Sequence, residues 1–218
     1  MLFALELDNG EMVHARTVLL ATGTEHRHLH VPGEAAFAGK GVSYCATCDG
    51  FFFKGKTVAV IGGSDSAAVS ALYLADIAAK VYVIYRGSEL RAESFWKQRI
   101  AAHERIEVLY DTSITEITGD TTVTAVTLDR PHNDAQTLPV DGVFVEIGAD
   151  PKIDFASALA LHTDDEGYID VDKSCKTSAE GVWAAGDITT GSDKFKQIVT
   201  AAAEGAIAAN SIQLWLKK

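Results

Sequence analysis

Residues 58–74 read VAVIGGSDSAAVSALYL, an apolar strand pattern that passes through two glycines into an alanine-rich helical pattern. A strand, a glycine turn and a helix in this order aim main-chain N–H groups and the positive end of a helix dipole at a pyrophosphate. The match to the G-x-G-x-x-G/A fingerprint is imperfect, because a serine stands at the second glycine position. The stretch still predicts a dinucleotide-binding turn. The residues of this turn are Gly62, Gly63, Ser64, Asp65, Ser66 and Ala67.

Strand and helix patterns alternate around this turn, which indicates an α/β fold. The series around the turn is expected to be strand 57–61, helix 64–77, strand 80–85, helix 92–103 and strand 106–111. A hairpin around Asn9-Gly10 is predicted by the turn chemistry of that dipeptide. The other expected elements are strands 2–7, 12–15, 16–23, 142–147 and 180–185, an antiparallel extension at 114–117 and 122–128, and a helix over 195–215.

The end of the second strand of the series indicates which nicotinamide cofactor is bound. An acid at this position binds the ribose 2′-hydroxyl of NAD, whereas an arginine accommodates the 2′-phosphate of NADP. Here the chain offers Arg86, with Arg91 a little further on. NADPH is therefore predicted in preference to NADH, although both arginines are also compatible with ordinary solvated loop positions.

The segment YCATCDGFFF, residues 44–53, places a C-x-x-C pair just before the glycine turn. Half a zinc site is one interpretation, but no second ligand pair follows at zinc spacing, so no metal is expected. A buried structural pair is another, and a redox dithiol is the third. Asp49 directly after Cys48 favours the dithiol, because a leaving thiolate needs a proton. Cys175 stands alone and is interpreted as incidental.

Composition excludes several classes of function. The 218 residues carry a formal net charge of −11 and contain no basic stripe, which argues against a nucleic-acid-binding protein. No apolar run approaches the ~18 residues of a transmembrane helix. The N-terminus lacks the basic flank, apolar centre and cleavage site of a secretory signal. The expected location is the cytoplasm.

The cysteine and glycine segments together resemble the low-molecular-weight thioredoxin reductase family, whose members place a C-A-x-C-D pair just before the glycine turn of the NADPH domain. Three further segments are similar to the family: LLATGTEHRHLHVPGE at 19–34, YRGSELRAE at 85–93 and GVWAAGDITTGSDKFKQIVTAAAEG at 181–205. The resemblance implies a flavoprotein with two dinucleotide-binding domains of three-layer, Rossmann-like architecture. It also implies a homodimer in which electrons pass from NADPH through FAD to the dithiol and on to thioredoxin.

The resemblance also implies roles for individual residues. Cys48 is expected to face the flavin, Cys45 to attack thioredoxin, and Asp49 to act as the acid–base group. The implied flavin-binding positions are Thr22, Gly23, Gly186, Asp187, Lys196, Gln197 and Ile198. Tyr85 and Gly87 depart from the histidine and arginine of the family pattern, which weakens the preference for NADPH over NADH.

The domain organisation expected from the resemblance is discontinuous. Residues 1–40 and 142–218 would form parts of the FAD domain, and 41–141 the NAD(P)H-binding domain with the cysteine pair. The opening strand and glycine turn of the FAD domain are not found in the sequence, so the first part of that domain is expected to be missing and FAD binding by this chain to be poor. Two alternatives stay open, namely a related flavoprotein that reduces another dithiol partner and a non-catalytic NAD(P)H-binding fragment.

Overall fold

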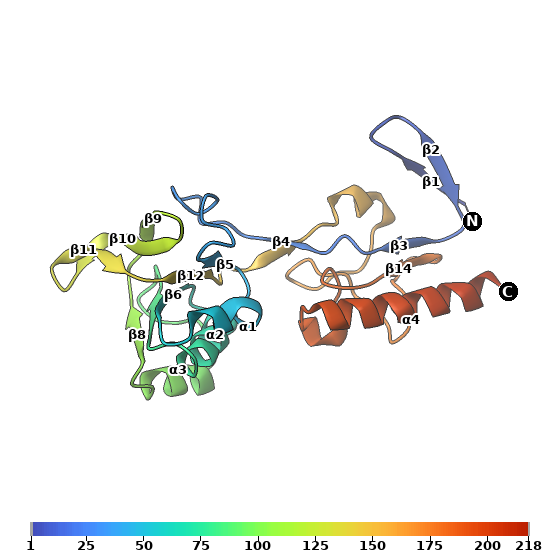
Figure 1. The fold of residues 1–218 in the computed structure, drawn as a ribbon. Coiled ribbons are helices and arrows are strands. Elements are labelled where there is room, and N and C mark those ends of the chain that lie inside the picture. Colours follow the sequence, from blue (N-terminus) through green and yellow to red (C-terminus); the bar gives the residue numbers. More distant parts are fainter. Residues whose placement is uncertain (1, 218) are drawn as a thin grey trace. The chain divides into compact units, whose positions relative to one another are not determined.

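The computed structural model describes residues 2–217 and divides them into two compact units. Residues 26–148 form the first, here called the central unit, and residues 2–25 with 149–217 form the second, the terminal unit. The expected boundaries were 1–40, 41–141 and 142–218, and the central unit extends beyond 41–141 at both ends. Figure 1 labels the elements of each unit.

A five-stranded parallel sheet forms the middle layer of the central unit. Its strand order is β5-β12-β6-β7-β8, with each neighbouring pair parallel. The strands are β5 (Val42–Ser43), β12 (Gly142–Val145), β6 (Thr57–Ile61), β7 (Lys80–Ile84) and β8 (Ile106–Leu109). Their nearly continuous valine and isoleucine runs suit a sheet that is covered on both faces.

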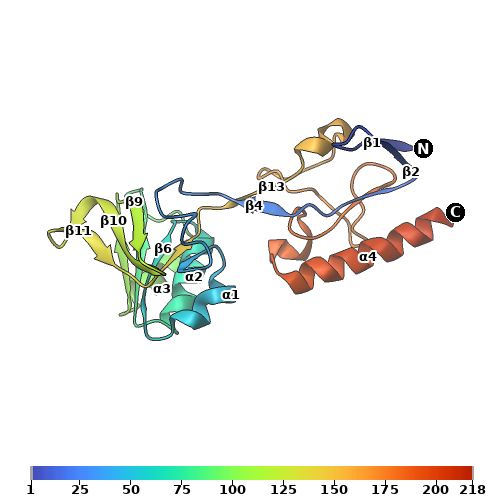
Figure 2. The ribbon, with the colours of Figure 1, turned by 45° about the horizontal axis from the view of Figure 1, so that its top comes forward.

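The two faces of this sheet are buried by different kinds of structure (Figures 1 and 2). Helices α2 (Asp65–Ala75) and α3 (Ser94–Ala101) cover one face, where Val60 and Phe144 are fully buried. An antiparallel sheet covers the other face, where Val126 packs with Val143. Its strands are β9 (Ile114–Gly119), β10 (Val123–His132) and β11 (Ala135–Pro139). The result is the three-layer, Rossmann-like architecture that the family resemblance implied.

The terminal unit is built on a short parallel pair, β3 (Val18–Leu20) and β14 (Val182–Ala184). Helix α4 (Ile198–Leu216) packs on β14 through Trp183, whose Nε1 donates to Ser211 Oγ at 3.0 Å. The remaining elements are the hairpin β1 (Phe3–Glu6) and β2 (Met12–Ala15), the ribbon β4 (Thr24–His26) and β13 (Ala149–Pro151), and the 3₁₀ turns η2 (Asp154–Leu159) and η3 (Gly191–Lys194).

Most expected elements are confirmed, and the differences have local causes. Helix α2 ends at Ala75 rather than residue 77, because the N–H groups of Asp76 and Ile77 donate to carbonyls three residues back, which tightens the last turn. Helix α4 begins at Ile198 rather than 195, where a capping box between Gln197 and Thr200 closes its first turn. Strand β11 was not expected, since Leu138 is its single buried side chain. Among residues 2–217, no helix has both the length and the apolar character needed to span a bilayer.

Candidate redox and nucleotide site

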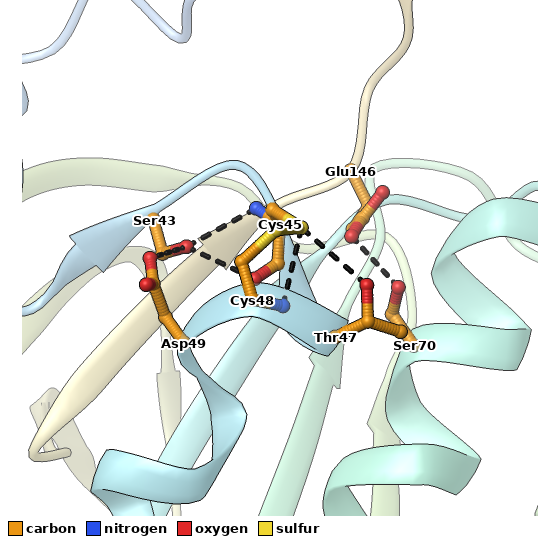
Figure 3. The surroundings of a disulfide bond; sticks show 7 residues. All are labelled: Ser43, Cys45, Thr47, Cys48, Asp49, Ser70 and Glu146. Carbon is orange, nitrogen blue, oxygen red and sulfur yellow. Dashed lines mark hydrogen bonds between the residues drawn. A yellow bond between two sulfur atoms is a disulfide. The ribbon is translucent and has the colours of Figure 1, made fainter. Parts of the chain in front are cut away.

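Cys45 and Cys48 form a disulfide in the central unit, with their Cα atoms 5.3 Å apart. The pair spans the one-turn helix α1 (Ala46–Asp49), which is followed by the 3₁₀ turn η1 (Gly50–Phe53). Figure 3 shows the bond and the side chains around it. The pairing fits the redox interpretation and not the zinc interpretation. Within residues 2–217, no group of three or more His, Cys, Asp or Glu side chains is arranged to hold a metal ion.

The two sulfurs have different surroundings. Cys45 is the N-cap of α1, and its Sγ accepts a hydrogen bond from the Cys48 N–H at 3.2 Å. The Thr47 hydroxyl lies 3.4 Å from the same sulfur. Cys45 is half-buried, whereas Cys48 is exposed. A main-chain N–H aimed at Cys45 Sγ would stabilise a thiolate on that atom once the disulfide is reduced.

Asp49 is tied to the chain that precedes the cysteines. Ser43 Oγ donates to Asp49 Oδ2 at 2.6 Å and accepts from the Cys45 N–H at 3.1 Å. Ser43 is buried at the end of β5, so the sheet fixes the position of the hydroxyl. The Asp49 carboxylate therefore has a defined place on one side of α1, and Ser43 was not singled out from the sequence.

A second carboxyl, that of Glu146, lies among the surroundings of the disulfide (Figure 3). Glu146 directly follows β12, and Ser70 Oγ of α2 donates to its Oε1 at 2.7 Å. Burial raises the pKa of Glu146 to about 6, against the lowering effect of the Ser70 hydrogen bond. The sequence did hold a signal for this residue, because a lone acid ends an otherwise apolar strand whose carboxyl end meets the glycine turn.

Another buried acid fixes the chain that leads to the cysteines. Glu34 is 4% exposed and accepts hydrogen bonds from the N–H groups of Leu29 and His30 and from the Tyr44 hydroxyl. Burial raises the pKa of Glu34, but these hydrogen bonds outweigh it, so the pKa lies below its usual value. Burial and the Glu34 carboxylate raise the pKa of the Tyr44 hydroxyl. Tyr44 is thereby held in place immediately before Cys45.

The predicted glycine turn lies between β6 and α2, and two of its residues must be glycine. Gly62 has a φ of +152°, and a Cβ there would lie 2.2 Å from the Glu146 carbonyl oxygen. A Cβ on Gly63 would lie 2.5 Å from the ring of Tyr85. Without side chains at Gly62 and Gly63, the main chain between the sheet and the N-terminus of α2 is uncovered. This is the form of a pyrophosphate-binding turn. The residues present fit the nicotinamide dinucleotide that the sequence predicts.

The remaining predicted nucleotide residues surround this turn. Arg86 and Arg91 are both exposed, and the Arg91 N–H donates to the Gly63 carbonyl at 2.7 Å, which holds the arginine-bearing loop against the turn. Ser64 and Ser66 share a hydrogen bond at 3.1 Å between their hydroxyls. The Asp65 carboxylate accepts from the Glu93 N–H at 2.7 Å, so it serves to anchor the start of α3.

In the terminal unit, four predicted flavin residues lie at one edge of the β3–β14 pair. Thr22 and Gly23 follow β3, and Gly186 and Asp187 follow β14. The strands are parallel, so their carboxyl ends meet at the same edge, where α/β sheets bind dinucleotides. The Thr22 hydroxyl donates to the carbonyl of Lys152 at 2.7 Å. Glycine is needed at 23 and 186, whose φ angles are +67° and +80°.

A shallow pocket brings Gly186 and Asp187 together with Lys196. Lys196 Nζ donates to the Tyr168 hydroxyl and lies over its ring. The floor holds Glu204, which was not predicted; it is 7% exposed and accepts from the Gly186 N–H at 2.8 Å. Hydroxyl groups, carboxylates and an ammonium in one pocket fit a hydroxylated ligand such as part of FAD. The other predicted residues, Gln197, Ile198, Thr22 and Gly23, are not part of its lining.

The chain is similar to known proteins of one family. The sequence model of one family, described as pyridine nucleotide-disulphide oxidoreductase, matches residues 3–205. A thioredoxin reductase of Mycolicibacterium smegmatis is 44% identical over 210 residues, which cover 95% of this chain and 67% of the relative. A bifunctional thioredoxin reductase/thioredoxin of Mycobacterium leprae is 40% identical over 95% of this chain and 45% of its own length.

A solved structure shows the same similarity. The crystal structure of thioredoxin reductase from Streptococcus pyogenes MGAS5005 superposes with a TM-score of 0.88 at 36% identity, over 97% of this chain and 69% of that one. The chain spans about two thirds of the length of the first curated relatives it matches.

Proposed function

Since this chain belongs to the pyridine nucleotide-disulphide oxidoreductase family, we propose that it serves the reduction of a protein disulfide, that of thioredoxin, by NADPH. FAD would accept hydride from NADPH and pass electrons to the Cys45–Cys48 pair. The observation that carries the proposal is the placement of that pair on α1, beside the glycine turn that fits the nucleotide. The names of the relatives support thioredoxin as the acceptor.

The binding roles follow from the two sheet edges. Gly62 and Gly63 would leave room for the pyrophosphate of NADPH, with Ser64, Ser66 and the α2 N-terminus as donors. The guanidinium groups of Arg86 and Arg91 would pair with the 2′-phosphate. Thr22, Asp187 and Lys196 would hold FAD at the edge of the terminal unit.

The two cysteines would divide the exchange between them. Cys45 would attack the acceptor disulfide, because the Cys48 N–H stabilises a thiolate on its sulfur. Cys48 would then attack Cys45 and release the reduced acceptor, and it is the cysteine expected to face the flavin. Asp49, held by Ser43, would exchange the proton of Cys48.

Two exposed aromatic residues next to the pair support a protein acceptor. Phe51 and Phe52 of η1 are 71% and 73% exposed and lie three and four residues after Cys48. Large exposed apolar side chains beside a reactive group are typical of a protein docking surface.

From the family resemblance we also propose a cytoplasmic homodimer. Sedimentation of the purified chain would test the dimer.

The decisive experiment traps the chain with its acceptor. Cys48→Ser leaves Cys45 without its partner, so a mixed disulfide with thioredoxin should accumulate and be visible by mass spectrometry of the intact complex. Cys45→Ser should form little adduct, and the buried Cys175→Ser should behave as wild type. Adduct formation through Cys175, or none through Cys45, would contradict the proposed roles.

Turnover tests the electron supply separately. NADPH oxidation is followed with the wild-type chain, added FAD and oxidised thioredoxin, and flavin binding is followed by its visible absorption. Thioredoxin reduction that depends on NADPH, FAD and both cysteines supports the proposal. NADPH binding without flavin binding or turnover would favour a nucleotide-binding module.

A further inference from the structure

Glu146 adjoins the glycine turn and is drawn among the surroundings of the disulfide. Its carbonyl oxygen is the atom that a Cβ on Gly62 would strike, and its side chain lies among the groups that surround Cys45 and Cys48 (Figure 3). The side chain is half-buried and receives a hydrogen bond from Ser70 Oγ at 2.7 Å. The roles proposed above for Cys45, Cys48 and Asp49 do not involve this carboxyl.

The carboxyls of Glu146 and Asp49 lie on different sides of α1. In Figure 3, Asp49 is on the side of Ser43, which holds it at 2.6 Å, and Glu146 is on the side of Thr47. The Thr47 hydroxyl lies 3.4 Å from Cys45 Sγ, so this second side is the one that Cys45 Sγ contacts. Thr47 and Glu146 therefore lie on the side of α1 toward which Cys45 Sγ is turned, and Asp49 lies on the other side.

The surroundings of Glu146 allow it to change its protonation near neutral pH. Burial raises its pKa to about 6. Of the residues drawn in Figure 3, Cys45 and Thr47 of α1 and Ser70 of α2 lie on the same side as Glu146, and none of the three carries a charge in the oxidised form. A carboxyl of this kind can both accept and return a proton in a neutral solution, as a general acid–base group must.

We propose that Glu146 is the proton-transfer group for Cys45, acting beside Asp49 in the exchange between the dithiol and the acceptor disulfide. The inference rests on the proposed function in that Cys45 is the attacking cysteine. It adds a residue and a role to that exchange.

The step balances without any further reactant. The Cys45 thiol gives its proton to the Glu146 carboxylate, and the resulting thiolate attacks one sulfur of the acceptor disulfide. A Cys45–acceptor S–S bond forms while the acceptor S–S bond breaks with its electron pair on the leaving sulfur. That sulfur takes the proton from the Glu146 carboxyl, which returns to its carboxylate form.

The test uses the full chain reduced chemically, without NADPH or FAD. After removal of the reductant, the rate of a single exchange is measured with two acceptors. One is an aromatic disulfide, 5,5′-dithiobis(2-nitrobenzoate), whose acidic thiol leaves without a proton, and the other is hydroxyethyl disulfide, whose basic thiol needs one. The variants are Glu146→Gln, Glu146→Asp as the conservative rescue, and Glu116→Gln as a control at an exposed carboxyl of the same unit.

Glu146→Gln should slow the aliphatic exchange about tenfold or more, a modest general-acid effect, and slow the aromatic exchange less, because that acceptor needs Glu146 only to take the Cys45 proton. Glu146→Asp should recover part of the aliphatic rate, and Glu116→Gln should match wild type. In the wild type, the ratio of aliphatic to aromatic rates should fall as the pH rises through about 6, where Glu146 loses its proton, and the ratio in Glu146→Gln should not show this step.

Equal slowing of both exchanges would overturn the inference, because it would mean that Glu146 delivers no proton to the leaving sulfur. An unchanged ratio would overturn it as well. Failure of the proposed NADPH-dependent activity would leave this result intact, since no cofactor takes part.

Discussion

Each unit pairs a glycine turn at the carboxyl end of a parallel strand with a glutamate beside it, and the two pairs are built differently. At Gly62, the close neighbour is the Glu146 main chain, whose carbonyl oxygen lies 2.2 Å from the point a Cβ would occupy, and the carboxyl has one hydroxyl donor. At Gly186, the nearest atom to such a Cβ is the methyl of Ala201 at 3.3 Å. There the Glu204 carboxylate itself accepts a hydrogen bond from the Gly186 N–H of the turn.

The difference shows two ways of fixing a turn. In the central unit, β6 has a neighbouring strand on each side and a buried layer on each face, and these fix the position of the main chain at the turn. The turn therefore needs no side-chain support, and the Glu146 carboxyl is available for chemistry. In the terminal unit, β14 has one parallel neighbour, and the buried Glu204 binds three donors around the turn. Glu146 is then expected to be functional and Glu204 structural.

The largest expected effect comes from the two glycines. Gly62→Ala places a methyl against a carbonyl oxygen in a backbone region that side chains rarely adopt, so it should cost about 3 kcal/mol or more in the free energy of unfolding and abolish NADPH binding. Gly186→Ala has a left-handed φ of +80° but only a mild contact, and should cost about 1–2 kcal/mol. Denaturant unfolding and NADPH titration measure both.

Gly205→Ala is the matched control for these substitutions. Gly205 lies inside α4 with nothing within 4 Å of its added Cβ, so alanine should stabilise the helix by about 0.5–1 kcal/mol. A similar loss in all three variants would show that the comparison between the turns is wrong.

Removing the carboxylate of Glu204 tests the terminal unit. Its oxygens accept from the Gly186 N–H, the Thr189 hydroxyl and, at 2.5 Å, the Ser192 hydroxyl. Glu204→Gln turns an NH₂ group toward one of these donors, which should cost about 2–3 kcal/mol because buried donors lose their acceptor. Hydrogen exchange should speed up around residues 186–192 and stay unchanged in the central unit, and an equal change in both units would contradict the assignment.

The sequence was informative where local chemistry and burial point the same way. The apolar run before Gly62, the glycines and the alanine-rich helix after them are consistent with one another, so strand, turn and helix were predicted close to their observed bounds. The cysteine spacing predicted a pair that can bridge, and the disulfide confirms it. Asp49 was singled out because it is adjacent in sequence.

What the sequence did not reveal depends on contacts between distant residues. Ser70 and Glu146 are 76 positions apart, and Gly186 and Glu204 are 18 apart, so the contacts of these glutamates were not evident from the sequence, and the one local signal was the position of Glu146 after an apolar strand. Strand β11 was missed because only Leu138 is buried on it, so its sequence has no alternating apolar pattern. Its strand conformation is fixed by its pairing with β10.

Replacing Arg86 and Arg91, which follow β7, tests whether the glycine turn at Gly62 binds NADPH. Both guanidinium groups are exposed, so Arg86→Ala combined with Arg91→Ala should leave the fold intact. NADPH affinity should fall about tenfold or more with the loss of charge-assisted bonds to the 2′-phosphate, while NADH affinity should stay within about twofold. Titrations of the two nucleotides against the variant and against Arg130→Ala, an exposed arginine on β10, give the answer. Equal loss for both nucleotides would place the arginines elsewhere than the 2′-phosphate.

The smallest expected effect concerns the pH dependence of stability, in which substitutions of Glu146 and Glu204 are compared. A carboxyl whose pKa is raised from 4.5 to about 6 on folding destabilises the folded protein at neutral pH, and the penalty disappears as the pH falls from about 6 to 4.5. The rise corresponds to about 2 kcal/mol, which solvent around the half-buried side chain reduces to about 1 kcal/mol. Glu146→Gln should therefore be more stable than wild type by about that amount at pH 7 and equal to it at pH 4.5, in urea melts compared across this range, whereas Glu204→Gln should be less stable at pH 7. A Glu146→Gln variant that loses stability at neutral pH would show that this glutamate, like Glu204, supports its turn and is not reserved for chemistry.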